Sequence, residues 1–275
     1  MAFRDQACAH LSEYRKDLLG IAEEGVFLHR GTPHRKGHIL PEGRERQNLL
    51  APYGDLFFAS EHADTKLHQY FHHLNSSQGL CINLFYPLLK EDALPLLIRS
   101  LGSDMSFPVK GIFESTSRLE NAERRTSFDF HLRNQEGRDL FVEVKYTEDG
   151  FGGAKVDAEH LEKFRDTYAP LLENSAYLTK DCNDPAFFLE HYQILRNMVH
   201  ITPESEVVFL FPRANGKVAE QAAHARETFL TEIGRERMRI VFLEDLVAEL
   251  IAASGGTSLE GYYESFRSKY LDFAY

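Results

Sequence analysis

Two neighbouring segments of the chain alternate apolar and polar residues with the period of two that is typical of β-strands. Residues 127–132 are apolar at every even position, and residues 140–145 are apolar at every even position as well. Between the segments, Gln135-Glu136-Gly137 suits a three-residue hairpin loop, because glycine takes the positive φ that such a loop requires. The pattern predicts a β-hairpin with one buried face.

The same pattern fixes how the two strands pair. Centring the turn on Glu136 pairs the apolar positions 128, 130 and 132 with 144, 142 and 140. This register places Asp129 opposite Glu143, with Lys145 beside them on the polar face, and a shift by one residue would destroy both sets. Two carboxylates and one amine are therefore expected on one patch of a sheet whose other face is buried.

Such a patch suits metal-dependent chemistry. Opposed residues on paired strands have Cβ atoms roughly 5 Å apart, so two carboxylates there repel each other unless a cation lies between them. Mg²⁺ suits a site with few protein carboxylates because it keeps several of its waters. Lys145 could orient or deprotonate a water, or stabilise charge on a phosphorane-like transition state. Together these groups indicate phosphodiester hydrolysis.

The acid, acid and lysine resemble the signature of the PD-(D/E)xK nuclease superfamily. The match is Asp129 followed by Glu143-Val144-Lys145, with 13 residues (130–142) between the acids. Phe128 stands where the superfamily often has proline. The resemblance implies the α/β (α+β) class, with a restriction-endonuclease-like core in which helices flank a central mixed sheet, and an extra N-terminal helical region.

A narrower resemblance covers about residues 70–250. The run 143–148 (EVKYTE) resembles one found in a group of bacterial proteins assigned as restriction endonucleases by sequence. Residues 76–85 are similar to an upstream helix of that group, and residues 192–197 to a downstream helix that carries Gln and Arg.

The order of predicted elements agrees with this core. Residues 206–212 are almost wholly apolar, as expected of a strand buried on both faces. Helices are expected at 61–74, 76–90, 91–101, 157–168, 185–200, 219–233, 244–253 and 259–273, and strands at 107–115, 125–134, 139–147, 206–212 and 239–243.

Length and composition favour one compact unit. The 275 residues contain no linker rich in Pro, Gly or Ser, so residues 1–60 are expected to pack, as a helix and a basic loop, on a nuclease-like domain of 61–275. No apolar run approaches the ~20 residues of a membrane helix, and the N-terminus lacks the apolar stretch of a signal peptide. The three cysteines are odd in number and scattered, which indicates reduced thiols in a cytoplasmic protein.

The net charge of −11 counts against nucleic-acid binding, because affinity for DNA comes largely from cations on phosphates. Residues 29–46 are nevertheless rich in Arg, Lys and His, and their Gly and Pro content predicts a loop. The segment could be a local phosphate-binding patch or an ordinary solvated loop, and the sequence leaves both open.

Two further residues are candidates for the site. Glu114 ends the strand before the hairpin and could supply a third metal ligand, although a surface glutamate near the end of a strand is common. Gln193 lies on a predicted helix with Arg196 and could contact a phosphate or the attacking water, or else serve as a capping residue.

The expected function is a nuclease of the restriction or defence type that uses Mg²⁺ or Mn²⁺ to hydrolyse DNA. A homodimer is one arrangement that the sequence leaves open. Asp129, Glu143 and Glu114 would hold the metal, Lys145 would position the attacking water, and Gln193 would assist. The alternatives are a nuclease-fold module that binds nucleic acid or a protein partner without cleavage, and an RNA-directed nuclease.

Overall fold

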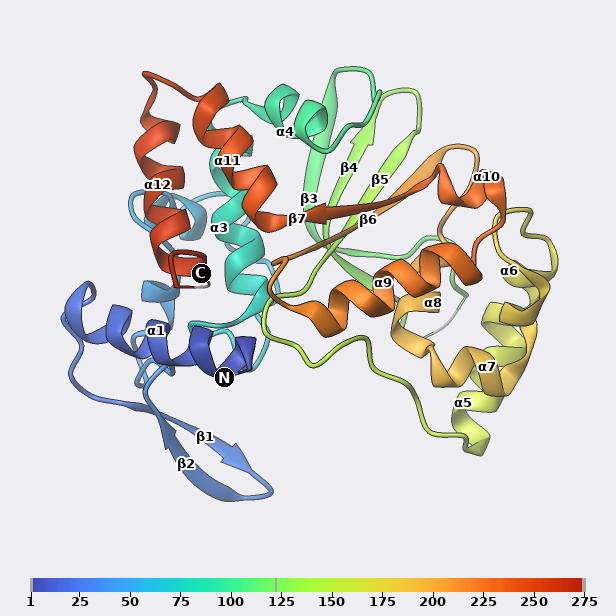
Figure 1. Cartoon of the computed structure of the whole chain (residues 1–275), viewed down its shortest axis with the longest axis horizontal. Helices are drawn as coiled ribbons and strands as arrows, with labels where there is room; N and C mark the ends of the chain where they lie inside the picture. Colours follow the sequence, from blue (N-terminus) through green and yellow to red (C-terminus); the bar gives the residue numbers. More distant parts are fainter. Residues whose placement is uncertain (1, 122, 274–275) are drawn as a thin grey trace.

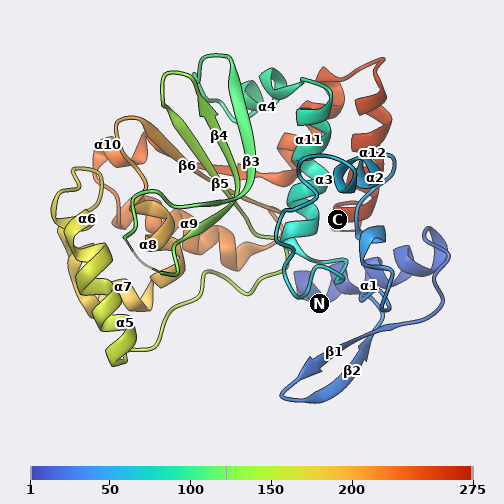
Figure 2. The same ribbon diagram turned by 180° about the vertical axis from the view of Figure 1, so that it is seen from behind.

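A central five-stranded sheet organises the chain, with helices on both of its faces (Figures 1 and 2). The computed structural model describes residues 2–121 and 123–273, and the backbone alone at His29. The strand order is β3-β4-β5-β6-β7; the first two pairings are antiparallel and the last two parallel. The strands are β3 (Val109–Thr116), β4 (Ser127–Asn134), β5 (Asp139–Val144), β6 (Ser205–Phe211) and β7 (Met238–Phe242). This mixed sheet confirms the predicted fold class.

Helices on one face of the sheet bury the larger of two apolar cores. Figure 1 shows α3, α11 and α12 together on this side, and the N-terminal helices add to the same core. The helices of this side are α1 (Phe3–Asp17), α2 (Tyr53–Phe58), α3 (Ser77–Lys90), α4 (Leu94–Ser100), α11 (Leu243–Ala253) and α12 (Ser258–Tyr270).

Helices from the middle of the chain cover the other face and form the second core. They are α6 (Ala169–Glu173), α7 (Pro185–Glu190), α8 (Tyr192–Met198) and α9 (Gly216–Thr228), with α5 (Ala158–Lys163) and α10 (Glu232–Arg235) at the periphery. Every residue of β6 is buried, since Val208 and Leu210 enter the first core while Val207 and Phe209 enter the second. This explains why β6 has no polar face.

The predicted hairpin register is confirmed for residues 130–133 of β4, whereas the ladder does not extend to the predicted pairs 128/144 and 129/143. Phe130 pairs with Val142 and Leu132 pairs with Leu140, and Gly137 in the turn has a φ of 86°. The ladder between β4 and β5 ends at Phe130, so Asp129, the preceding residue of β4, lies just outside the ladder.

The predicted alternation, in contrast, is wrong at Phe128. Phe130 stacks on Phe85 of α3, with 4.5 Å between ring centroids, whereas Phe128 stacks at 4.5 Å on Phe141, which packs against the second core. The two phenylalanines therefore face opposite sides of the sheet. The strand β4 changes face at the residue between them, Asp129.

The neighbouring strand changes face at the opposite position. Phe113 contacts Phe130 in the first core, but Ser115 hydrogen-bonds to His131 Nδ1 at 3.0 Å on the other side. Between them, Glu114 has a φ of 49°, a left-handed conformation that is uncommon for a residue other than glycine. Two adjacent strands are thus reversed at Glu114 and Asp129, and this local distortion turns both side chains toward one end of the sheet.

Two expectations for the N-terminal third are wrong. Residues 61–74 form turns and not a helix, because their backbone bonds to another segment: Leu40 N donates to His72 O and Leu74 N donates to His38 O, both at 2.9 Å. Part of the basic segment 29–46 is a hairpin and not a loop. It pairs β1 (Gly25–His29) with β2 (Thr32–Lys36), and its tip takes positive φ at both residues of a tight turn.

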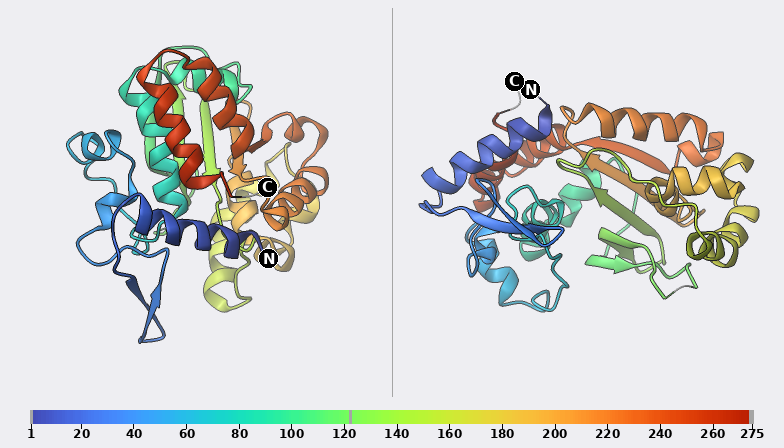
Figure 3. Two further views of the ribbon diagram at one scale, coloured as in Figure 1. Left: turned by 60° about the vertical axis from the view of Figure 1, so that its left-hand side comes forward. Right: turned by 90° about the horizontal axis from the view of Figure 1, so that it is seen from below.

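The two ends of the described chain meet beside the first core (Figure 3). Phe3 of α1 stacks on Phe273 at 5.9 Å and contacts the ring of Tyr146 at the same distance. The three cysteines are all free thiols. Among the described residues, no helix is both long and apolar enough to cross a membrane.

Candidate active site

A cavity of about 670 Å³ opens where β3 and β4 change face. It lies between the start of α3, the segment that follows β5 and the start of α8. Its lining residues are Arg4, His68, Tyr70, His73, Asn75, Ser76, Ser77, Gln78, Glu114, Asp129, Lys145, Thr147, Glu148, Asp149, Gly150, Gly152 and Gln193. Four of the five residues that the sequence predicts for the site line this one cavity.

Asp129 owes its orientation to the end of the β4–β5 ladder. Its Oδ2 accepts a hydrogen bond of 2.7 Å from the backbone N–H of Val144, in place of the next ladder bond. Its other oxygen, Oδ1, accepts no hydrogen bond from the described residues. One oxygen of Asp129 is therefore held by the sheet, and the other is available to a ligand in the cavity.

Glu143, near the end of β5, and Lys145, the residue directly after the strand, form an ion pair of 3.0 Å. Both side chains are largely buried, with exposed fractions of 11% and 15%. Burial by itself would lower the pKa of Lys145, but the carboxylates of Glu143, Glu148 and Asp129 outweigh it and hold the pKa above its usual value. Lys145 lines the cavity, whereas Glu143 lies behind it and is not part of the lining.

Glu114 is fixed on both sides by hydrogen bonds. Gln78 Nε2 donates to its Oε1 at 2.7 Å and Ser127 Oγ donates to its Oε2 at 3.1 Å. Burial is the main reason that the pKa of Glu114 is raised. Gln78 also accepts from His68 N and donates to Lys66 O, so the start of α3 holds Glu114 in place.

The three carboxylates occupy one cross-strand row. Phe113 and Ser115 pair with Phe130 and Phe128, so Glu114 and Asp129 lie at the same level of the β3–β4 ladder. The β4–β5 ladder ends at the pair Phe130 and Val142, which are the residues next to Asp129 and Glu143. Burial, followed by the charges of Glu143 and Glu114, raises the pKa of Asp129 well above its usual value. Three carboxyl groups and one ammonium, that of Lys145, therefore lie close enough to influence one another's charge.

Gln193 has a structural role that is visible in the geometry. Its side-chain Oε1 accepts from Gly152 N at 3.1 Å, and its own backbone N–H donates to Gly152 O at 2.9 Å. The residue thus fixes the segment that follows β5 against α8, on the rim of the cavity. This arrangement is similar to the capping role that the sequence left open for Gln193. Its side-chain Nε2 donates no hydrogen bond to the described residues.

Several cavity residues were missed by the sequence analysis. Asn75 Nδ2 donates to Thr147 Oγ1 at 2.8 Å and joins the start of α3 to the segment after β5. Arg4, Tyr70 and His73 reach the cavity from parts of the chain with no recognisable motif. The serine before α3 was the one available signal, because Ser76 is the N-cap of that helix.

The donor set fits a hard divalent cation. It offers carboxyl oxygens whose mutual repulsion a cation would relieve, including one oxygen of Asp129 that has no partner among the described residues. No group of three or more His, Cys, Asp or Glu side chains in the described part of the chain is arranged to hold a metal ion. A metal in this arrangement would take one or two carboxylates and complete its shell with water, as Mg²⁺ does in proteins.

The mixed sheet with helices on both faces and this row of carboxylates define a restriction-endonuclease-like α/β protein. The chain belongs to the family described as Restriction Endonuclease associating with ARP, whose model matches residues 8–271. Comparisons with curated proteins and with solved structures gave no significant match.

Proposed function

We propose that the protein is a metal-dependent nuclease of the PD-(D/E)xK type that hydrolyses phosphodiester bonds of DNA. The observation that carries the proposal is the row of Glu114, Asp129 and Glu143 on three adjacent strands, with the buried ammonium of Lys145 beside it. The family, described as a restriction endonuclease, supports the same reaction class.

Asp129 and Glu143 are the proposed metal ligands, and Glu114 is a third once its carboxylate leaves Gln78 or Ser127. A divalent cation bound there would neutralise the carboxylates and polarise the phosphate as a Lewis acid. Removing the repulsion within the row would also favour the ionised form of Asp129.

Lys145 acts as a cation and not as a base. Because its pKa is raised, the amine holds its proton at neutral pH and cannot take one from water. The ammonium instead orients the attacking water through a donated hydrogen bond and stabilises the charge that develops on the phosphate. Gln193 holds the segment after β5 in place and directs its Nε2 toward a phosphate oxygen.

DNA is the proposed substrate because the family is described as a restriction endonuclease. The family description also names an association with ARP, and we propose that the chain works together with such a partner.

The test is to incubate the purified protein with Mg²⁺ or Mn²⁺ and plasmid, linear duplex, single-stranded DNA or RNA. We expect cleavage of duplex DNA that EDTA abolishes and that Asp129→Asn removes. The matched control is Asp166→Asn, which alters an exposed aspartate paired only with its neighbour Arg165. Cleavage of RNA but not of DNA would show that RNA is the substrate. An Asp129→Asn variant as active as wild type would overturn the proposed site.

A further inference from the structure

The hairpin of β1 and β2 projects from the body of the molecule below α1 (Figures 1 and 3). All five residues of β2 are exposed, and no third strand pairs with the hairpin among the described residues. A two-stranded hairpin in water is only marginally stable by itself, so an exposed one of this kind needs either a strong anchor or a partner.

The charge of this hairpin is opposite to that of the whole chain. Residues 25–38 contain Arg30, Arg35 and Lys36 and no acidic residue, in a protein with a net charge of −11. Leu28 also lies on the hairpin with an exposed fraction of 65%. The positive potential of such a surface attracts a polyanion, and its exposed apolar side chains can contact one.

The base of the hairpin is anchored firmly. Gly25 N donates to Ile39 O at 2.9 Å, and Ile39 forms a β-bridge with His73. A Cβ at Gly25 would lie 2.2 Å from Leu40 O, so only glycine permits this close approach. The hairpin is therefore fixed in direction relative to the residues around the cavity.

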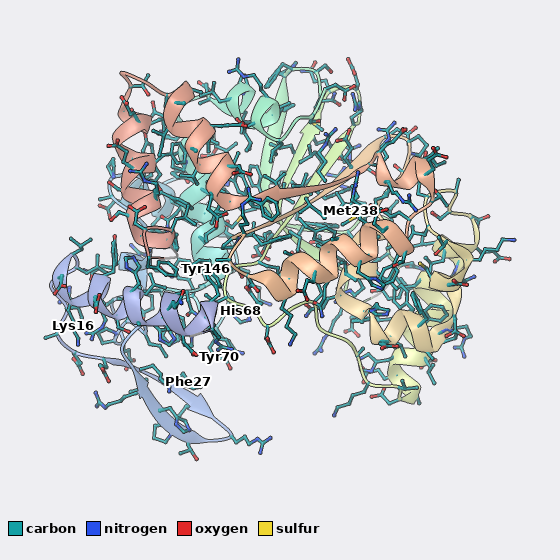
Figure 4. All side chains as sticks on the ribbon, viewed as in Figure 1. Lys16, Phe27, His68, Tyr70, Tyr146 and Met238 are labelled. Atoms are coloured by element: carbon teal, nitrogen blue, oxygen red, sulfur yellow. The ribbon has the colours of Figure 1, made fainter. Side chains whose placement is uncertain are left out.

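A chain of aromatic rings leads from the hairpin into the cavity. Phe27 contacts His73 at 5.9 Å, His73 contacts Tyr70 at 5.0 Å, and Tyr70 contacts His68 at 5.3 Å between ring centroids. Figure 4 shows Phe27, Tyr70 and His68 in succession from the hairpin toward the middle of the molecule. The last three rings of this chain line the cavity that holds Asp129 and Lys145.

His73 points independently to a ligand. Its Nε2 is buried and has no hydrogen-bond partner among the described residues. Burial lowers the pKa of His73 to about 3, so the ring is neutral at physiological pH. A buried ring nitrogen without a partner is uncommon and costs free energy unless a bound group satisfies it.

We propose that the hairpin of β1 and β2 is an arm that enters a groove of duplex DNA and directs one strand over the aromatic rings into the cavity. Five residues per strand span roughly 17 Å, and a two-stranded ribbon fits the major groove, which is about 12 Å wide. This inference deepens the proposed function: it rests on nucleic acid as the substrate and specifies a duplex bound through the hairpin.

The test is binding without cleavage, measured by fluorescence anisotropy in EDTA with a labelled 30-base-pair duplex. The variant Arg35→Glu/Lys36→Glu reverses two exposed charges on the hairpin. The matched control, Lys90→Glu/Lys180→Glu, reverses two exposed charges far from it in sequence. We expect the hairpin variant to bind at least ~10-fold more weakly and to lower the slope of log K against log salt by about 2, with the control close to wild type.

Equal loss of affinity in both double variants would overturn the inference, because it would reflect net charge alone. Tighter binding of a single strand than of the duplex by wild type would also overturn it. Thermal melting of the variants checks that the fold is intact. This outcome is distinct from that of the proposed function. A wild-type protein that binds duplex DNA through the hairpin but never cleaves it would refute the proposed nuclease activity and support the hairpin as a DNA-binding arm.

Discussion

Lys145 is the residue whose charge decides how the site can work. Its ammonium is buried among carboxylates that raise its pKa, so it is a permanent cation at neutral pH. A cation that contacts the phosphate only in the ground state would contribute to binding, whereas one that meets developing charge contributes mainly in the transition state.

The variant Lys145→Met should therefore lower the cleavage rate by ~10²-fold or more while the affinity for DNA barely changes. Methionine keeps the apolar stem of the side chain and removes the ammonium, with its charge, its hydrogen-bond donors and its ion pair to Glu143. Single-turnover cleavage and anisotropy on the same duplex measure the two quantities. A loss of affinity as large as the loss of rate would mean that Lys145 merely holds the substrate.

Asp129 should make stability depend on pH. Its pKa in the folded protein lies above its value in the unfolded chain, so its contribution to stability is complete below the unfolded pKa of about 3.9 and is lost as pH rises through the folded pKa. At pH 7 without metal, Asp129→Asn should be more stable than wild type, since asparagine still accepts from Val144 N. The gain should vanish below about pH 4. Thermal melting over pH 3–8 in EDTA checks this, and no gain at pH 7 would contradict it.

Metal binding should depend on the carboxylate row. Either Asp129→Asn or Glu143→Gln should weaken Mn²⁺ binding in calorimetry, because each removes one of the few available oxygen ligands with charge. Asp166→Asn is the control. Unchanged affinity in both site variants would show that the carboxylates are not ligands.

At the scale of the element, β3 has an unusual requirement at Glu114. A left-handed residue inside a strand reverses the usual preference for side chains, because valine suits a normal strand whereas glycine suits a φ of 49° far better than valine does. Both replacements remove the carboxylate, so they differ in backbone conformation and not in charge.

Glu114→Gly should therefore be more stable than Glu114→Val, by roughly 1–2 kcal/mol. At Ile112, two residues earlier on the same strand, the order should be the reverse, with Ile112→Val more stable than Ile112→Gly. Urea denaturation of the four variants gives the comparison. The same order at both positions would show that β3 is a regular strand.

The element scale also shows what could be predicted from the sequence. The β4–β5 hairpin has a glycine turn and largely alternating strands, and its register at residues 130–133 was predicted because a slip would move apolar side chains off the buried face. The change of face at Asp129 was missed because it depends on Glu114 in the neighbouring strand. Residues 61–74 were predicted as a helix, but hydrogen bonds between this segment and residues 38–40 give it a different backbone.

At the scale of the whole molecule, the site draws on distant segments. Arg4, Asn75 and Gln193 reach one cavity only through tertiary packing, and no spacing in the sequence relates them. The acid, acid and lysine pattern was visible because two paired strands carry it. The roles of these residues remain predictions that the cleavage and metal-binding measurements test.

The two cores should protect the thiols to different degrees. Cys81 and Cys182 are buried, and Cys8 is half-buried. Burial raises the pKa of each, which lowers the thiolate fraction that reacts. In the native protein we expect slow labelling of Cys8 by a thiol reagent and protection of the other two, with all three labelled in denaturant. Mass spectrometry locates the label, and rapid native labelling of Cys81 would contradict the packing of α3.

The change of face at Asp129 connects the packing on the two sides of the sheet. Phe128 belongs to the packing on one side of the sheet and Phe130 to the packing on the other. The backbone of Asp129 lies between them, so its position depends on the packing of both phenylalanines. A substitution that repacks either core shifts the backbone of Asp129. If Asp129 serves the proposed activity, that activity would depend on residues on both faces of the sheet, including residues that line no part of the cavity.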